Sequence, residues 1–241
     1  DDASTDRSVE IIAQAGVTLL RRGSNGGFAA TVNTGLKYII ERKYSMVLIA
    51  NSDVVINTDV GNRIMAEVEA FNGRNDVAIL GFIEETAKDT TRFLGQNIPG
   101  FFFALKRSAI EKVGFLDESY YMYGEEQDYF RRATGCGVGI SQSGIRIGHG
   151  SEKSGRSKIK NSWYAIRNAL RLEAKHRNFT RLLRTCIVLL MIINRIYRPP
   201  VGADPSLSRV LRPGIILGNV FLLCSLLLNV ILYTKTVAFR K

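Results

Sequence analysis

The sequence predicts an α/β protein in which a mixed, Rossmann-like sheet is flanked by helices and followed by a hydrophobic, helical C-terminal tail. Apolar runs of strand length alternate with amphipathic helical patterns between residues 45 and 113, an order typical of such sheets. The tail differs in charge: residues 152–241 carry 17 Lys and Arg against 3 acidic residues, whereas residues 1–151 carry 16 against 19. We therefore expect one domain over residues 1–156 and a basic tail over residues 157–241.

The chain opens with a polar turn. Residues 1–6 (Asp-Asp-Ala-Ser-Thr-Asp) are rich in helix-capping types, and a helical pattern follows them up to Gly16. Residues 17–20 then indicate a short strand. The glycine turn Asn25-Gly-Gly opens a second helix to about residue 42, because its apolar residues keep helical spacing: Ala29, Val32, Leu36, Ile39 and Ile40.

Residues 45–50 form a continuous apolar run, which is typical of a parallel strand covered by helices on both faces. The run ends at Asn51-Ser52-Asp53. In open α/β sheets, ligands bind beyond the carboxyl ends of such strands, so Asp53 stands where a ligand-binding acid is expected. A strand-end Asp taken alone is more often a turn or helix-capping residue than a ligand.

The alternation continues through one more helix and strand and then relaxes. Its expected elements are a helix over residues 60–71, a strand over 77–82, a polar loop over 84–98, a strand over 101–105, a short helix over 108–113, and short strands over 135–141 and 145–147. His149 follows the last strand in a glycine-rich turn. A single histidine is more often a surface or core residue than a ligand, so His149 alone decides nothing.

Three carboxylates crowd the start of another predicted helix. Glu125, Glu126 and Asp128 follow a run of tyrosines and a glycine. Acidic residues in a first helical turn are favoured by the helix dipole, so an ordinary helix start is one interpretation. The other is a general base with helpers, because like charges and apolar neighbours raise the pKa of a carboxyl toward the range useful for proton abstraction.

The tail combines basic residues with apolar runs. A basic helix is expected over residues 157–176, and an apolar run over residues 186–193 is flanked by arginines and too short to span a bilayer. Residues 214–234 contain no charge and, at ~1.5 Å per residue, would reach about 30 Å. We expect this tail to associate with a membrane surface by spanning it or lying in its interface; packing as a buried soluble helix is the alternative.

The basic residues and the cysteines bear on the partner and the compartment of the chain. Nucleic acid is disfavoured, because the basic residues border apolar runs instead of forming a groove with stacking aromatics. Cys136, Cys186 and Cys224 are widely separated and match no metal-site spacing, which is typical of a reducing compartment. We therefore place the chain at the cytoplasmic face of a membrane.

Several of these motifs occur in one order. They are Asp-Asp-Ala-Ser-Thr-Asp, Asn-Gly-Gly-Phe-Ala-x3-Asn-x-Gly, Asn-Ser-Asp after a strand, Gly-Phe-Leu-Asp-Glu, Tyr-Gly-Glu-Glu-Gln-Asp and a final His before Gly-Ser. The ordered set, over residues 1–176, resembles the inverting family 2 glycosyltransferases of the GT-A fold, and most of all their rhamnosyltransferase-type members. The resemblance implies a nucleotide-diphosphate sugar donor, a divalent cation (Mg²⁺ or Mn²⁺) and a hydroxyl acceptor on a glycan or lipid-linked intermediate.

The resemblance also implies roles for residues on the donor side. Asp2, together with Asp1, would lie beside the nucleobase. Asn25, Gly27 and Asn33 would shape the turn and the helix next to the nucleotide.

Metal binding would fall to the strand-end motif. Asp53 matches the last position of the family's Asp-x-Asp motif and would bind the ion, with His149 helping to hold the metal or the diphosphate. Ser52, inside the motif, belongs to the expected nucleotide-sugar site. Asn51 stands where the family usually has the first Asp, a variation that the family tolerates.

Catalysis would fall to the crowded carboxylates. Glu126 matches the catalytic Asp of the family's Glu-Asp pair, Glu125 matches its Glu, and Asp128 is a further candidate. The change from Asp to Glu lengthens the base by one methylene. A displacement of about one ångström can cost on the order of 100-fold in rate if nothing compensates.

A second departure concerns the N-terminal side. Family members carry about two more strands and a helix before the Asp-Asp turn, so we expect a truncated sheet whose core is exposed on one side. The leading hypothesis is a membrane-associated glycosyltransferase. The alternatives are a non-catalytic, membrane-anchored module of the same fold and, more distantly, a basic nucleic-acid-binding protein.

Overall fold

The computed structural model describes residues 1–85, 98–150, 158–178 and 182. The chain divides into two compact units, Asp1–Arg156 and Ser157–Lys241. The strands of the first unit are β1 (Met46–Ala50), β2 (Val54–Val55), β3 (Ile79–Glu84), β4 (Phe102–Lys106) and β5 (Ile140–His149). Its helices are α1 (Ser8–Gln14), α2 (Gly27–Glu41), α3 (Thr58–Gly73), α4 (Arg107–Val113), the 3₁₀ turn η2 (Glu118–Tyr120) and α5 (Glu125–Gly135).

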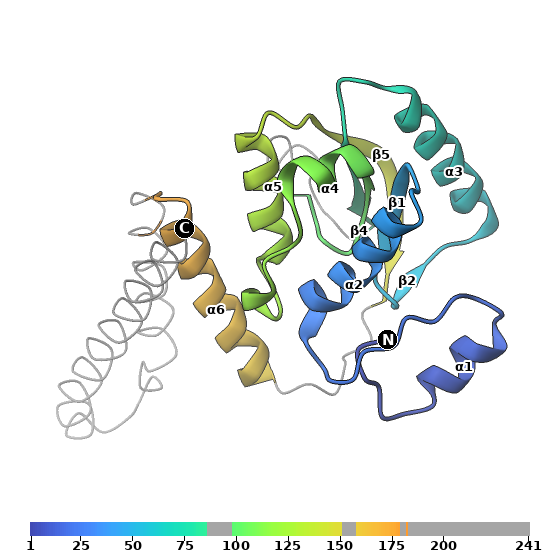
Figure 1. The fold of residues 1–241 in the computed structure, drawn as a ribbon, viewed down its shortest axis with the longest axis horizontal. Coiled ribbons are helices and arrows are strands. Elements are labelled where there is room, and N and C mark those ends of the chain that lie inside the picture. Colours follow the sequence, from blue (N-terminus) through green and yellow to red (C-terminus); the bar gives the residue numbers. More distant parts are fainter. Residues whose placement is uncertain (86–97, 151–157, 179–181, 183–241) are drawn as a thin grey trace, which may run out of the picture. The chain divides into compact units, whose positions relative to one another are not determined.

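The described strands form one mixed sheet in the order β1-β4-β3-β5-β2 (Figure 1). β3 and β5 run parallel, whereas β4 is antiparallel to both of its neighbours. β2 pairs antiparallel with the last residues of β5, with Val54 opposite His149. This pairing carries the chain that leaves β1 to the carboxyl end of β5, so two strand ends that are far apart in sequence meet.

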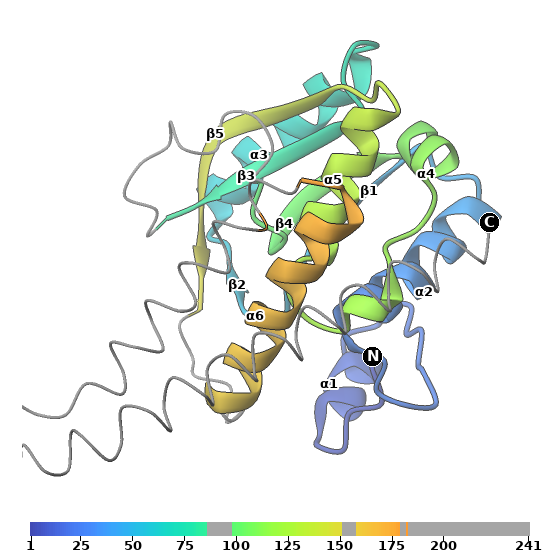
Figure 2. The ribbon, with the colours of Figure 1, turned by 90° about the vertical axis from the view of Figure 1, so that its left-hand side faces the viewer.

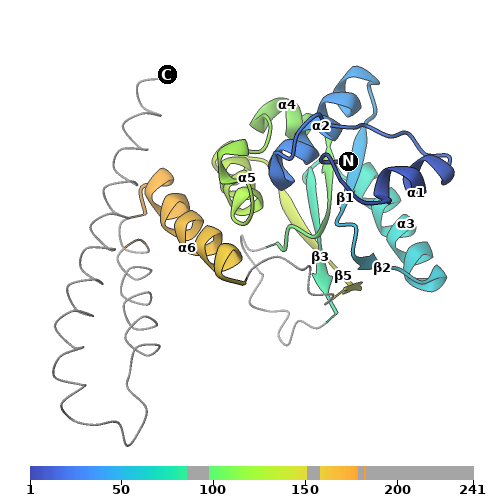
Figure 3. The ribbon, with the colours of Figure 1, turned by 90° about the horizontal axis from the view of Figure 1, so that it is seen from below.

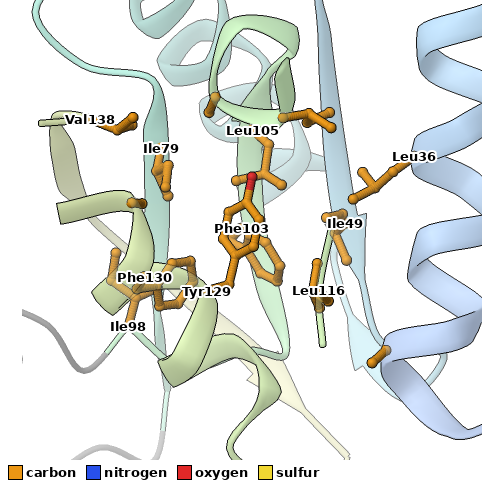
Figure 4. Close-up of a cluster of buried hydrophobic side chains, with 14 residues drawn as sticks. Leu36, Ile49, Ile79, Ile98, Phe103, Leu105, Leu116, Tyr129, Phe130 and Val138 are labelled. Atoms are coloured by element: carbon orange, nitrogen blue, oxygen red, sulfur yellow. The ribbon is translucent and has the colours of Figure 1, made fainter. Parts of the chain in front are cut away.

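Helices cover both faces of the sheet, with α2, α4 and α5 on one face and α3 on the other (Figures 2 and 3). β4 serves both cores because its side chains alternate: Phe103 and Leu105 join the core under α2, α4 and α5 (Figure 4), and Phe102 and Ala104 join the core under α3. All four are at most 1% exposed. The predicted mixed sheet flanked by helices is therefore confirmed.

Three details of the predicted elements are wrong. Residues 17–20 are not a strand, and Val17 is 60% exposed. The two short strands expected over 135–141 and 145–147 are one strand, β5, which begins only at residue 140 and whose polar stretch at Gln142 and Ser143 hid its continuity. The strand over residues 45–50 has only an antiparallel neighbour among the described residues, and Leu48 on it is 36% exposed.

The second unit contains α6 (Lys158–Lys175), the predicted basic helix. The apolar runs over residues 186–193 and 214–234 lie outside the described residues. Among the helices that the structure does describe, none has the length and apolar character needed to cross a membrane.

Candidate active site

The two strand ends that β2 brings together carry an acid and a histidine. Nε2 of His149, the last residue of β5, lies 3.1 Å from Oδ1 of Asp53 in the turn after β1. The backbone holds this turn in place, because the N–H of Gly150 donates to the carbonyl oxygen of Asp53 at 2.7 Å. Ser52 lies in the same turn and is exposed. The side chain of Asp53 is 43% exposed and that of His149 24% exposed, so a ligand can reach both.

His149 is held from two further sides. Its Nδ1 lies 3.4 Å from Oε1 of Glu84, at the end of β3. The ring of Phe101 stacks on the imidazole, with 4.8 Å between centroids and an interplanar angle of 24°. The sequence-based interpretation missed Glu84 because the predicted strand stopped at Phe82; extended by two residues, the strand-end rule would have found it.

Asp53 and His149 together meet the first requirement of a divalent-cation site. Two ligand atoms bound at about 2.1 Å to one octahedral ion lie about 3 Å apart, and the observed separation is 3.1 Å. Within the described residues, no three His, Cys, Asp or Glu side chains are grouped to hold an ion by themselves. The pair therefore fits an ion that takes its remaining ligands from a phosphate group and water, as Mg²⁺ commonly does.

Glu125 and Glu126 begin α5, as predicted, and their environments differ. Glu125 is 4% exposed, and its Oε2 has no hydrogen-bond partner among the described residues. Burial, reinforced by the charge of Glu126, raises the pKa of Glu125 to about 7. Burial also raises the pKa of Glu126, although the residue as a whole is only half-buried. Of the two glutamates, Glu126 is the less buried.

Two consecutive residues connect the glutamates to the strand-end pair. Gly100 lies against Glu126, since a Cβ at residue 100 would stand 2.7 Å from Cγ of Glu126. The next residue, Phe101, stacks on His149 and accepts a hydrogen bond from the N–H of Asn51 at 2.8 Å. Through these two adjacent residues, Glu126 is linked to the Asp53–His149 pair.

Asp128, the third predicted carboxylate, has another setting. It is fully buried, and its Oδ2 accepts a hydrogen bond from Nε of Arg132 at 2.9 Å. Arg132 in turn donates to the carbonyl oxygens of Val113 and Phe115, both at 2.8 Å. Asp128 thus holds Arg132, which ties α5 to the end of α4, and a catalytic role for Asp128 stays a prediction.

The N-terminal turn caps α2. Oδ1 and Oδ2 of Asp2 accept hydrogen bonds from the backbone N–H groups of Gly26 and Gly27 at 2.9 and 2.8 Å. Burial raises the pKa of Asp2, but these hydrogen bonds outweigh it and leave the pKa below its ordinary value. The side chain of Asp1 is 2% exposed and accepts from the N–H of Ser4. Both residues lie where they shape the turn before α2.

Comparison with known proteins decides the family. The sequence model described as "Glycosyl transferase family 2" matches residues 1–130, more than half of the chain. This chain belongs to glycosyl transferase family 2. No curated protein matches the sequence closely enough to serve as a relative.

Solved structures share the fold of this family 2 chain. A mannosyltransferase from Pyrobaculum calidifontis, solved with GDP-Man and Mn²⁺, aligns with a TM-score of 0.57 at 17% identity, over 90% of this chain and 69% of the other. Glucosyl-3-phosphoglycerate synthase from Mycobacterium tuberculosis, solved with phosphoglyceric acid, aligns with a TM-score of 0.50 at 12% identity, over 72% of this chain and 66% of the other. The expected GT-A fold is thus confirmed.

The remaining residues expected on the donor side of this glycosyltransferase domain contact residues 116–121 of the same chain. Oδ1 of Asn25 accepts a hydrogen bond from the Tyr121 hydroxyl at 2.9 Å. Gly27 has φ +81°, and a Cβ there would stand 2.1 Å from the Tyr121 carbonyl oxygen, so only glycine fits. Asn33 is 2% exposed and its amide is bound to Leu116 and Glu118. These contacts, across more than 80 residues, had no signal in the sequence.

Proposed function

We propose that this chain transfers a sugar from a nucleotide-diphosphate sugar to a hydroxyl of a glycan or lipid-linked acceptor, with inversion at the anomeric carbon. The observation that carries the proposal is the joining of Glu126 to the Asp53–His149 pair through Gly100 and Phe101. Inverting transfer requires a proton acceptor on one side of the donor and charge stabilisation at the departing diphosphate on the other. The site offers groups for both.

Glu126 is the proposed general base. As the acceptor oxygen forms its bond to the anomeric carbon and the bond to the diphosphate breaks, the hydroxyl proton passes to a carboxylate oxygen of Glu126. A base works best when its pKa approaches the working pH, and burial moves the pKa of Glu126 in that direction. Glu125, whose pKa is about 7, still carries its proton in part at neutral pH, which limits the repulsion that Glu126 meets.

Asp53 and His149 are the proposed ligands of Mg²⁺ or Mn²⁺. The ion, when bound, supplies positive charge that stabilises the diphosphate leaving group. The mannosyltransferase that shares this fold was solved with Mn²⁺ and GDP-Man, which supports the same cofactor class here. Glu84 and Phe101 orient His149, because they contact Nδ1 and the ring face and leave Nε2 directed at Asp53.

The finer features of the proposal come from the sequence. The motif order favours a hexosyltransferase of rhamnosyltransferase type that acts in polysaccharide synthesis. The basic, apolar tail over residues 157–241 favours work at the cytoplasmic face of a membrane, where a lipid-linked acceptor would be presented. The non-catalytic alternative is not favoured, because the chain belongs to glycosyl transferase family 2 and shares its fold with a mannosyltransferase and a glucosyl-3-phosphoglycerate synthase.

The test is a donor screen with the full chain. Wild-type protein is incubated with Mn²⁺ and, in turn, UDP-glucose, GDP-mannose and dTDP-rhamnose, with and without sugar and polyprenyl-phosphate-linked acceptors, and products are followed by mass spectrometry. We expect metal-dependent turnover of one donor that is lost in Asp53→Asn. Turnover of none of the donors by folded wild-type protein would contradict the proposal. Product NMR then decides inversion from the anomeric coupling.

A further inference from the structure

We propose that Asn33 is a positioning residue of the transfer reaction, which acts from inside α2 by anchoring the loop that delivers Glu125 and Glu126. The inference rests on the proposed function, because it concerns the geometry of the same two glutamates. The family resemblance implies that Asn33 shapes the turn and the helix next to the nucleotide; the contacts of its amide add the loop before α5 to that task.

The side-chain amide of Asn33 makes all its hydrogen bonds to one loop. Nδ2 donates to the carbonyl oxygen of Leu116 and to Oε1 of Glu118, both at 2.9 Å, while Oδ1 accepts from the N–H of Leu116 at 2.9 Å. Asn33 is 2% exposed, so water does not compete for these bonds. Such an amide holds the loop specifically. A shorter or a charged side chain at this position would leave the buried groups that it binds without hydrogen-bond partners.

The clamped loop, residues 114–124, needs to be held. Tyr121 and Tyr123 have φ values of +63° and +67°, and Gly124, the residue before α5, has φ +93°. Non-glycine residues rarely adopt this left-handed region and keep it only where the surroundings impose it. The loop therefore depends on contacts outside itself for its shape.

α2 supplies those contacts at two points. Asn33 holds the first part of the loop at Leu116, and the N-terminus of α2 holds the later part, where the N–H of Phe28 donates to the Tyr121 carbonyl oxygen at 3.0 Å. The Tyr121 hydroxyl adds its bond to Asn25. Of these anchors, Asn33 is the buried one with three bonds.

The loop leads directly into the catalytic helix. Glu125 is the first residue of α5 and Glu126 the second, so a loop that loosens releases the N-terminal turn of α5. Glu126 has little freedom to adapt, because Gly100 already lies against its side chain. A displacement of about one ångström at a reacting group costs on the order of 100-fold in rate. Asn33 thus acts on the reaction without touching the reacting atoms.

The first measurement is hydrogen–deuterium exchange of the full chain without ligand. In Asn33→Ala, we expect backbone amides of residues 114–124 to exchange at least tenfold faster than in wild type. Val68→Ala, which removes buried volume under α3 on the other face of the sheet, is the stability-matched control and should leave that loop at the wild-type rate. Glu118→Ala breaks one of the three bonds and should give a smaller increase. Wild-type exchange of the loop in Asn33→Ala would overturn the proposal.

The second measurement is steady-state kinetics with the donor that the full chain turns over. Asn33→Ala and Asn33→Asp should lower kcat for transfer about 100-fold while the donor KM stays within threefold. Asn33→Asp places a second carboxylate beside Glu118, so Glu118→Gln in that background should restore part of kcat. A fast-exchanging loop with wild-type kcat would overturn the positioning role. If wild type turns over no donor, the proposed function falls, and exchange still decides whether Asn33 holds the loop.

Discussion

Gly100 leaves the space that the side chain of Glu126 fills: a Cβ at residue 100 would lie 2.7 Å from Cγ and 3.0 Å from Cβ of Glu126. Contacts this short do not occur between carbon atoms, so any larger residue at position 100 must displace the glutamate. The two residues come from different parts of the chain, the turn before β4 and the start of α5. Their fit fixes where the proposed base stands relative to the strand-end pair.

Gly100→Ala should therefore impair catalysis with little effect on the fold. Displacement of Glu126 by about one ångström is expected to lower kcat by about 10-fold to 100-fold, with donor KM nearly unchanged. Gly73→Ala at the end of α3 is the matched control, because a Cβ there meets nothing within 4 Å. Steady-state transfer rates of the two variants check this; equal rates for both would show that the base does not depend on Gly100.

Glu125 should make stability depend on pH. Its pKa is about 7 in the folded chain and about 4.5 in the unfolded chain. The contribution of Glu125 to the free energy of unfolding is therefore fully present below about pH 4.5 and is lost as the pH rises through about 7. The loss amounts to roughly 3 kcal/mol at most. Urea midpoints at pH 5 and pH 8 should fall with pH in wild type and fall less in Glu125→Gln. Glu69→Gln, on the exposed side of α3, should keep the wild-type slope; an unchanged slope in Glu125→Gln would contradict the prediction.

Asp53→Asn should remove metal-dependent donor binding and leave stability nearly intact. The side chain is 43% exposed and has little packing to lose. The measurement is donor binding by calorimetry with and without Mn²⁺, together with the thermal unfolding midpoint. Asp59→Asn in the first turn of α3 is the control and should retain the Mn²⁺ effect. Retention of that effect in Asp53→Asn would move the ion to other ligands.

The strand-end half of the site could be predicted from the sequence. Asp53 follows an apolar strand and His149 ends one, and open sheets gather such residues at one edge. α2 and α5 were predicted because glycines and acidic residues mark their starts and apolar spacing marks their lengths. Local rules suffice for both, since each depends on residues close together in the chain.

The contacts that set the geometry were not predictable in the same way. Asn33 binds Leu116, which is 83 residues away in the sequence. An asparagine in a helix does not by itself indicate that it is buried or which residue it binds. The pairing of Gly100 with Glu126 likewise depends on how β4 and α5 pack. Glu84 was missed for a smaller reason, because the predicted strand stopped at Phe82, two residues before β3 ends. Long-range packing, and not propensity, decides these positions.

The tail over residues 157–241 should bind anionic membranes. Residues 157–241 carry 15 Lys and Arg against 2 acidic residues, a net charge of +13, and contain two apolar runs. Co-sedimentation of the full chain with vesicles of phosphatidylglycerol and phosphatidylcholine should persist at 1 M salt if apolar insertion dominates, because charge alone is screened there. Vesicles of phosphatidylcholine alone are the control for the charge contribution. Absence of sedimentation at every salt concentration would contradict membrane association.

The single-turnover rate of sugar transfer by Glu126→Gln, measured beside Glu125→Gln and wild type, tests the proposed base most directly. Gln keeps the size and hydrogen bonding of Glu126 but cannot accept the proton, so we expect the rate to fall by about 10² to 10⁴ with donor affinity little changed, and less in Glu125→Gln. Glu126→Asp shows whether the backbone has adjusted to the longer side chain. A Glu126→Gln rate equal to that of wild type would exclude Glu126 as the general base.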